Sequence, residues 1–286
     1  GPLDGVDQVA CGSRLSAEEG GDHTDRRLLC QFIRNCVAVQ ETPAWGRGVR
    51  GWERVTVAEP TMDGHHAGPP SERTKVRRLP ERAAYERERI EAVLDEGFVC
   101  HLGFAGRDGR QVVIPTTYGR DGDTVYVHGS PAAGMVRSLR GGLDASLAVT
   151  LVDGLVLARS AFHHSMNYRS VVLVGRGERV DDPDEKRAAF DAIVDHVVPG
   201  RSQVARPASG SELRATFVLR LPIDEGSVKV RGHGAGDDDD DLDLAVWAGV
   251  VPTRLVADDP IQEPDQRVSD LAPPVAAAFD RGHGPT

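Results

Sequence analysis

The chain has 286 residues, of which 40% are hydrophobic and 27% charged, which is typical of an ordinary globular protein. Its formal net charge of -10 argues against nucleic-acid binding as the main function, because surfaces that bind nucleic acid are basic. No window approaches the roughly 18 consecutive apolar residues of a membrane-spanning helix, and the N-terminus lacks the pattern of a secretion signal. We therefore expect a cytoplasmic protein with neither a membrane nor a nucleic acid as its partner.

The two ends of the chain differ in composition from its middle. Residues 1–73 are rich in Gly, Asp, Glu, Arg and Pro and show no sustained strand alternation, so we expect a disordered N-terminal extension. Met62 is the first methionine, which suggests that the residues before it come from a misplaced start codon. Residues 258–286 are rich in Pro, Asp and Gly and are expected to form a flexible tail. A single folded domain is predicted over residues 74–257.

Apolar runs broken by turn residues define the first half of this domain. A helix is expected over residues 81–96, where apolar residues recur at helical spacing before the stop signal Gly97. Residues 98–105 and 111–118 form a predicted hairpin, because a Gly-Arg-Asp-Gly turn separates them. The next expected elements are a turn (119–123), a strand (124–128) and a helix (132–140).

The second half of the domain continues the series of short strands. Residues 145–152 and 155–159 are predicted to form a hairpin across Asp153-Gly154, the strongest two-residue turn signature of the chain. The pattern of antiparallel strands with inserted helices favours a barrel over a doubly wound sheet, so the predicted fold class is mainly β (α+β). The remaining expected elements are a strand (168–180), a helix capped by Asp182 or Asp184 (184–198), a helical lead-in and strand (212–221), a strand (227–231), an acidic loop (236–243) and a strand (247–256).

A phosphate cradle is one interpretation of the segment between Tyr126 and Arg137. A strand there runs into the Gly129-Ser130 turn and then a helix start, where free backbone N–H groups and the helix dipole favour an anion. Ser130 would serve as the N-cap or as a phosphate donor, and Pro131 suits the first helical position. The alternative, which this segment alone favours, is an ordinary helix cap.

Two strand segments offer further contacts for a nucleotide. Arg169 provides a planar donor fork for phosphate and Ser170 a hydroxyl, but strand alternation turns them to opposite faces unless a bulge or an edge intervenes. Pro115 removes a ladder donor and so indicates an edge or a bulge, where exposed backbone groups would meet the edge of a flavin ring. The plainer alternatives are a solvated arginine and an edge strand protected from aggregation.

Three motifs in chain order are typical of one protein family. They are Val113-Ile114-Pro115-Thr116-Thr117-Tyr118, Tyr126-Val127-His128-Gly129-Ser130 and the long run from Gly154 to Ser170, continued by residues 227–231 and 246–250. With them the chain resembles the pyridoxamine 5′-phosphate oxidase-related, FMN-binding split-barrel family, in particular its nitroimidazole-resistance reductase branch. True pyridoxamine phosphate oxidases carry an Arg-x-Val-Leu-Leu-Lys strand and a Gly-Ser-Arg-Lys turn, which this chain lacks, so oxidation of vitamin B6 is not implied.

The resemblance implies a six-stranded antiparallel split β-barrel with flanking helices, whose homodimer interface holds FMN. It also implies a flavin-dependent oxidoreductase that passes electrons to a small nitro, quinone or oxygen acceptor. The alternatives are an F420-dependent reductase and a non-catalytic flavin- or haem-binding protein. By matched position, His128 is the candidate catalytic residue, and the implied cofactor contacts are Pro115, Thr116, Thr117, His128, Gly129, Ser130, Arg137, Arg169, Ser170 and Trp247.

Other charged residues give weaker signals. Lys229 and Arg231 share a strand face and are candidates for binding an anionic substrate, with a surface role as the alternative. His163 and His164 point to opposite faces if they lie on a strand, and no carboxylate or cysteine follows at ligand spacing; one of them stays open as a haem ligand. The Asp237–Asp241 run lacks the alternating ligands of an EF-hand loop. No metal site is predicted.

Overall fold

The computed structural model describes residues 68–106, 108–129 and 142–268. All of them belong to the unit Thr56–Thr286, and the other unit, Gly1–Val55, lies outside the described residues. The predicted helix over 132–140 and most of the two predicted flexible ends also lie outside. The described strands are β1 (Ala83–Ala84), β2 (Cys100–Ala105), β3 (Gln111–Thr116), β4 (Gly119–Asp121), β5 (Thr124–Gly129), β6 (Leu143–Leu157), β7 (Ser165–Arg179), β8 (Phe217–Pro222), β9 (Gly226–Arg231) and β10 (Gly249–Pro252).

The strands form an antiparallel sheet in the order β3-β2-β6-β7-β8-β5-β4. Strand β9 pairs with β7, β1 pairs with β9, and β10 pairs with β6. Within the described residues the sheet does not close into a complete cylinder. The mainly antiparallel architecture with few helices is the predicted fold class, which is thereby confirmed. The helices are α2 (Arg87–Glu96), α4 (Pro183–Val197) and α5 (Gly210–Ala215), and the 3₁₀ turns are η1 (Pro80–Arg82), η2 (Ala161–His163), η3 (Arg201–Gln203) and η4 (Asp239–Asp241).

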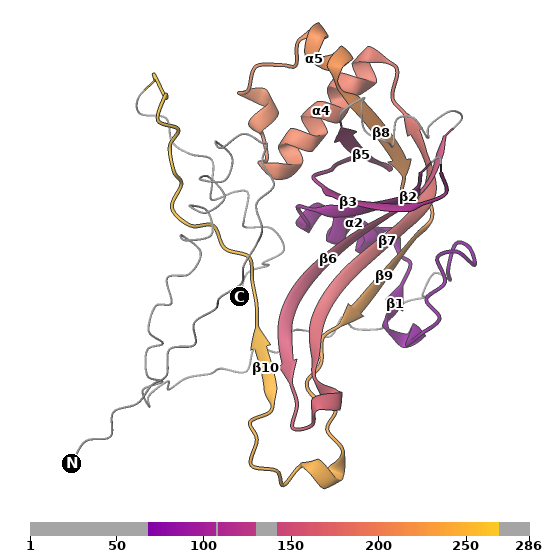
Figure 1. Cartoon of the computed structure of the whole chain (residues 1–286), viewed down its shortest axis with the longest axis vertical. Helices are drawn as coiled ribbons and strands as arrows, with labels where there is room; N and C mark the ends of the chain where they lie inside the picture. The colour runs from indigo at the N-terminus through magenta and orange to yellow at the C-terminus, as the bar shows by residue number, and fades with distance from the viewer. Residues whose placement is uncertain (1–67, 107, 130–141, 269–286) are drawn as a thin grey trace, which may run out of the picture. The chain divides into compact units, whose positions relative to one another are not determined.

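A long ribbon of β6 and β7 organises the sheet (Figure 1). On the outer edge of β6, β2 pairs with residues 145–148 and β10 with residues 154–157. On the outer edge of β7, β9 pairs with residues 168–173 and β8 with residues 178–179. The ribbon therefore joins the barrel strands to an extension that carries β10.

The predicted hairpin across Asp153-Gly154 is wrong. Residues 143–157 form one strand, and the register with β7 shifts between Val152 and Gly154, which is a β-bulge. Odd-numbered residues are buried before the bulge, as at Val149, whereas even-numbered ones are buried after it, as at Val156. Two contacts hold the bulged residue, because the Asp153 carboxylate accepts hydrogen bonds from Arg169 and its carbonyl accepts one from the Thr253 N–H.

Two hydrophobic clusters explain where the helices lie. The larger one fills the space between the sheet and α2 and contains Leu94, Leu147 and Leu173. The smaller one lies under α4 and contains Tyr126, Val218 and Ile193. No helix of the described residues combines the length and apolarity needed to cross a bilayer.

Local capping explains several element boundaries. Helix α4 begins after Asp182, whose carboxylate accepts hydrogen bonds from the N–H groups of Asp184 (3.0 Å) and Glu185 (2.8 Å), as one of the two predicted caps. Helix α2 begins only at Arg87, because residues 80–82 form η1 and β1 pairs with β9. The predicted turn at residues 119–123 is narrower than expected, since residues 119–121 form β4.

Candidate functional site

One face of the β3-β2-β6-β7-β9 region lies opposite the hydrophobic core, and we call it the outer face. Directly paired residues of antiparallel strands share a face, so the registers define its rows. One row runs Pro115, His101, Ala148, Val172. A second row, on one side of it, runs Val113, Gly103, Ser146, Val174. A third row, on the other side, runs Thr150, Ser170, Lys229.

The outer face is unusually open for a sheet surface that carries apolar side chains. Val113 is 65% exposed and Val172 40% exposed, and they flank the small residues Gly103, Ser146 and Ala148. Exposed apolar side chains on both sides of a run of small residues are a feature of faces that a ligand or another chain covers. A flat ring system fits such a surface, because the small side chains allow it to approach the sheet closely.

Strand β3 places the three predicted ring contacts at one margin of the outer face. Pro115 lies on this face opposite His101, as an exposed residue. Thr116 pairs with the buried Cys100 and so belongs to the core side, and Thr117 follows the end of the strand. Among the described strands β3 pairs only with β2, so its second edge presents backbone groups, as expected from a proline in an edge strand.

Arg169 and Ser170 point to opposite faces, as simple alternation requires. Ser170 lies on the outer face, where its hydroxyl donates to the Lys229 carbonyl oxygen at 3.4 Å. Arg169 lies on the core side, level with Leu151 and Val230. The two residues that the sequence grouped as one candidate contact are thus separated by the thickness of the sheet.

Two carboxylates already bind the Arg169 guanidinium. Its Nη2 donates to Glu96 Oε1 at 2.7 Å and to Asp153 Oδ1 at 2.8 Å, Nε donates to Asp153 Oδ2 at 3.1 Å, and Nη1 donates to Glu96 Oε2. These hydrogen bonds, first Glu96 and then Asp153, raise the pKa of Arg169. A phosphate at this arginine would have to displace carboxylates that join α2 to the bulge of β6.

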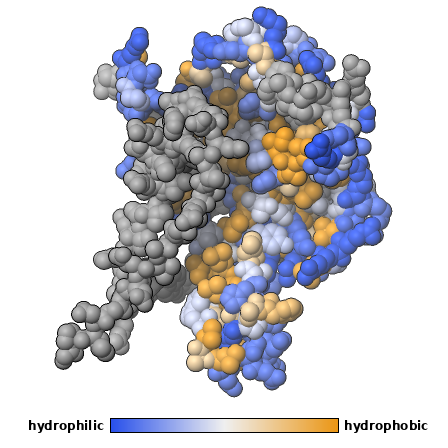
Figure 2. Space-filling view, in the orientation of Figure 1, coloured by the Kyte–Doolittle hydropathy of each residue, from blue (hydrophilic) through white to orange (hydrophobic). Residues whose placement is uncertain are grey.

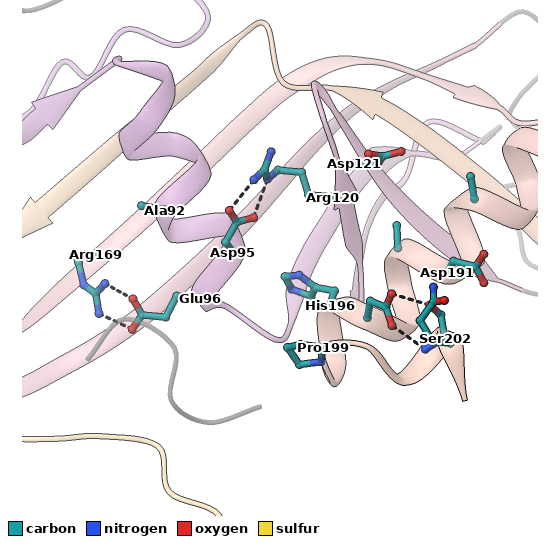
Figure 3. A pocket seen from close by; sticks show the side chains of 14 residues that line it. Ala92, Asp95, Glu96, Arg120, Asp121, Arg169, Asp191, His196, Pro199 and Ser202 are labelled. Carbon is teal, nitrogen blue, oxygen red and sulfur yellow. Dashed lines mark hydrogen bonds and ion pairs between the residues drawn. The ribbon is translucent and has the colours of Figure 1, made fainter. Parts of the chain in front are cut away.

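Arg169 also borders an open pocket of about 960 Å³ between α2, β4 and α4 (Figure 3). A second arginine there, Arg120, forms a bidentate pair with Asp95 at 2.7 and 2.6 Å. The other titratable residues of the pocket wall are the carboxylates Glu96, Asp121, Asp191 and Asp195 and the imidazole of His196. Because carboxylates outnumber guanidinium groups, the pocket has the wrong sign for a phosphate.

His128 lies on β5, away from the outer face. Its ring packs against Phe190 of α4, with centroids 6.3 Å apart, and among the described residues its buried Nδ1 has no hydrogen-bond partner. Gly129 is the last residue of β5 and pairs with Phe217. Ser130 and Arg137 lie outside the described residues. A polar ring atom without a partner at the end of β5 leaves room for an interaction with a further group.

The remaining predicted residues lie on β9 and near β10. Lys229 continues the outer face, and its Nζ donates to the Arg78 carbonyl oxygen at 2.8 Å. Arg231 is 6% exposed and binds neutral oxygens only. Trp247 is 63% exposed and precedes β10, where Figure 2 shows hydrophobic surface over the tip of the β6–β7 ribbon.

The acidic loop and the paired histidines have structural partners. Asp237 is buried and accepts hydrogen bonds from the Arg159 N–H at 2.9 Å and the Arg159 Nη1 at 2.8 Å. His163 contacts Asp238, and His164 contacts the Ser160 carbonyl oxygen. Within the part of the chain that the structure describes, no group of three or more His, Cys, Asp or Glu side chains is arranged to hold a metal ion.

Sequence reasoning missed the partners that decide what each cation does. Glu96 and Asp153 neutralise Arg169, and Arg82 reaches the His233 imidazole beside Arg231. The small residues of the outer face were also missed, although the alternation of Ser146, Ala148 and Thr150 with buried neighbours is visible in the sequence. What the sequence lacks is the register that aligns them with Gly103 and Val172.

Residues 86–230 match a family model described as pyridoxamine 5′-phosphate oxidase. The flavocytochrome Anf3 from Azotobacter vinelandii is similar over 74% of this chain and 99% of its own, with 38% identity and a TM-score of 0.68. An FAD and heme binding protein from Mycobacterium smegmatis is similar over 69% of this chain and 97% of its own, with 36% identity and a TM-score of 0.64. A search of the curated proteins returns no match.

Proposed function

The chain belongs to the pyridoxamine 5′-phosphate oxidase family, and on that premise we propose that it is an oxidoreductase that binds FMN on its outer face. The observation that supports this is the open row Pro115, His101, Ala148, Val172, which apart from the His101 imidazole consists of small or apolar side chains and lies beside an edge strand. The bound flavin would supply hydride and electron transfer, which protein side chains lack. The proposed acceptor is a small nitro compound, a quinone or oxygen.

The residues of the outer face would have separate tasks in this proposal. The free edge of β3 around Pro115 would hydrogen-bond the polar edge of the ring. Ala148 and Val172 would support its flat face and exclude water, and Ser170 would donate to the ribityl chain. Small side chains on a rigid sheet suit these tasks, because they hold the ring without adjusting.

A second copy would complete the site. In one chain the end of β5, with His128 and Gly129, pairs with β8 and lies under α4, whereas the outer face lies on β3, β2, β6, β7 and β9, so the two groups of predicted contacts come from different strands of the sheet. A homodimer in which the β5 end of one copy reaches the outer face of the other would bring them together. The exposed valines of the outer face and the exposed Trp247 would lose water in the same step.

The absorbance spectrum of the full chain tests the cofactor, and chromatography of the released cofactor identifies it. We expect a yellow protein that releases FMN. Release of FAD would correct the nucleotide, in keeping with the name of the mycobacterial relative. A colourless protein that binds only added F420 would replace the flavin proposal.

A bulky substitution tests the place of binding. Val172→Trp should largely abolish flavin binding, because an indole in the middle row would occupy the surface that the ring needs. Val204→Trp is the matched control, since Val204 is more exposed and follows η3. Equal flavin content in both variants would rule out the outer face as the binding surface.

Complementation tests the second copy. Val172→Trp and His128→Ala should each impair turnover of a nitroaromatic with NADPH. Mixed dimers should regain part of the activity, because one of their two sites receives an intact face and an intact β5 end. No recovery in mixed dimers of confirmed composition would place each site within one chain.

Haem is a second candidate ligand, bound in addition to flavin. Two relatives that align over nearly their whole length are named for a flavocytochrome and for FAD and heme binding. A Soret band beside the flavin bands in the purified protein would support it, and flavin bands alone would exclude it for the purified state.

A further inference from the structure

Arg231 carries a charge that the described residues do not neutralise. It is 6% exposed, and its guanidinium donates to Asn167 Oδ1, to the His233 carbonyl oxygen at 2.7 Å and to the Gly234 carbonyl oxygen at 2.9 Å. All three acceptors are neutral. Burial, and after it repulsion by Arg82, lowers the pKa of Arg231. A buried charge without an opposite charge is unfavourable and rare in folded proteins.

Further cations surround Arg231. Pairing of β1 with β9 aligns Ala83 with Lys229, which brings η1 and its Arg82 beside the strand. The Arg82 Nη2 lies 3.1 Å from the His233 Nε2, and the Lys229 Nζ donates to the Arg78 carbonyl oxygen. We call the group of Arg82, Lys229 and Arg231 the cationic corner.

The corner brings together three cations without an ion pair among the described residues, one of them buried. Elsewhere in the described residues, several arginines form ion pairs, among them Arg87, Arg120, Arg169 and Arg220. Within the same described ranges, Arg82, Lys229 and Arg231 form no ion pair with a carboxylate. On a chain with a net charge of -10, carboxylates are abundant, so a group of three cations without an ion pair is a local positive potential that attracts an external anion.

The corner adjoins the outer face. Lys229 pairs with Ser170 and Ser170 with Thr150, so the third row of the outer face ends at the corner. We propose that the cationic corner is a phosphate-binding site, in which Arg82 and Lys229 contact the phosphate of a nucleotide that lies along the outer face and the buried charge of Arg231 adds to the positive potential behind them. Guanidinium forks match phosphate oxygens in geometry, and a dianion balances more of the positive charge than a monocarboxylate. The inference rests on the proposed function only for the identity of the nucleotide.

Two sources of the phosphate are compatible with this place. It belongs either to the flavin itself or to a nucleotide electron donor such as NADPH. Both share the chemistry of a phosphate monoester. Arg169 does not compete for this role in the structure, because Glu96 and Asp153 occupy its donors.

Pyrophosphate is the probe that tests the corner without a flavin. We expect it to raise the thermal midpoint of the full chain, and Arg82→Gln and Lys229→Gln to weaken its affinity at least about tenfold each, as expected for loss of a charge-assisted contact. Both residues are partly exposed, so the variants should fold. Arg214→Gln is the control, because Arg214 is exposed on α5. Unchanged pyrophosphate affinity in both corner variants would overturn the proposal.

Two comparisons identify the source. If the flavin phosphate is bound, the corner variants lose affinity for FMN but keep that for riboflavin, which lacks the phosphate. If the donor phosphate is bound, the ratio of KM for NADPH to KM for NADH rises while FMN and riboflavin binding stay unchanged. A chain that binds pyrophosphate at the corner but no flavin would refute the proposed function alone. If Val172→Trp blocks flavin binding but the corner variants bind pyrophosphate as tightly as the wild type, this inference alone is refuted.

Discussion

Arg169 on β7 and Arg231 on β9 lie one register position apart on neighbouring strands, but their guanidinium groups have opposite surroundings. Arg169 binds Glu96 and Asp153 beside a pocket whose wall is rich in carboxylates. Arg231 binds one amide oxygen and two carbonyl oxygens beside Arg82. An arginine that finds its counter-charge within the chain stabilises the fold, whereas one that does not leaves a positive charge that an anion bound nearby can balance.

The largest expected effect comes from packing around the acidic pocket. A Cβ added to Gly119 would lie 2.5–2.6 Å from backbone atoms of Ala192 and Ile193 in α4. Gly119→Ala should therefore lower the free energy of unfolding by about 3 kcal/mol, because helix backbone cannot move aside as a flexible side chain can. Urea denaturation measures this. Gly236→Ala is the control with open space around it, and equal stability of the two variants would contradict the close packing of α4 on β4.

The ion pairs of Arg169 should contribute the next largest effect. Arg169→Ala leaves Glu96 and Asp153 without their partner, and we expect a loss of about 2 kcal/mol in the free energy of unfolding. The value is below that of a fully buried pair, since the Arg169 side chain is 32% exposed. Arg254→Ala, at an exposed position, should change stability little. Full stability of Arg169→Ala with weakened FMN binding would instead restore Arg169 as the cofactor anchor expected from the sequence.

A corner arginine should behave differently when no anion is present. In phosphate-free buffer Arg82→Gln should stay within about 0.5 kcal/mol of the wild-type free energy of unfolding, because it removes repulsion with Arg231 rather than an ion pair. Adding pyrophosphate should then raise the free energy of unfolding of the wild type more than that of Arg82→Gln. A large loss of stability in phosphate-free buffer would mean that Arg82 has a counter-charge within the chain.

The smallest expected effect concerns the exposed ion pair between Arg206 and Glu212. The Arg206 guanidinium, followed by the Ser209 N–H, lowers the pKa of Glu212 to about 2. Since the folded-state pKa is below the ordinary value of 4.5, the contribution to stability is present above pH 4.5 and disappears as the pH falls through 2. An NMR titration of the Glu212 carboxyl should show a higher pKa in Arg206→Gln. An identical titration in both proteins would assign the shift to the Ser209 capping box alone.

The sequence was sufficient for the architecture because its strands and helices are local patterns. Alternation, the turn around Gly109 and the cap at Asp182 each depend on a few neighbouring residues, and the structure contains all three. The hairpin at Asp153-Gly154 failed because a two-residue turn signature also fits a bulge, and the choice was made by Arg169 and β10, which lie elsewhere in the chain.

The candidate site was less accessible to sequence reasoning. Strand alternation alone predicts that Arg169 and Ser170 point to opposite faces of the sheet, and the structure confirms this. Whether an arginine is neutralised depends on residues such as Glu96, 73 positions away from Arg169, and no local pattern reports that distance. The contacts expected of Pro115, Thr116, Thr117, His128, Gly129, Ser170 and Trp247 with a cofactor stay predictions, as do those of Ser130 and Arg137, which lie outside the described residues.

The bulge between Val152 and Gly154 fixes the length of β6 to the single residue. One extra residue there sets the phase of everything that follows, so that Val156 enters the interior and Leu155 does not. Deleting Gly154 would restore an uninterrupted two-residue alternation in which Val156 still faces inward, but it would draw Asp153 into the regular ladder, away from the position in which it binds Arg169 and the Thr253 N–H. The extra residue therefore acts as an attachment point, which ties β6 to Arg169 of β7 and to Thr253 directly after β10.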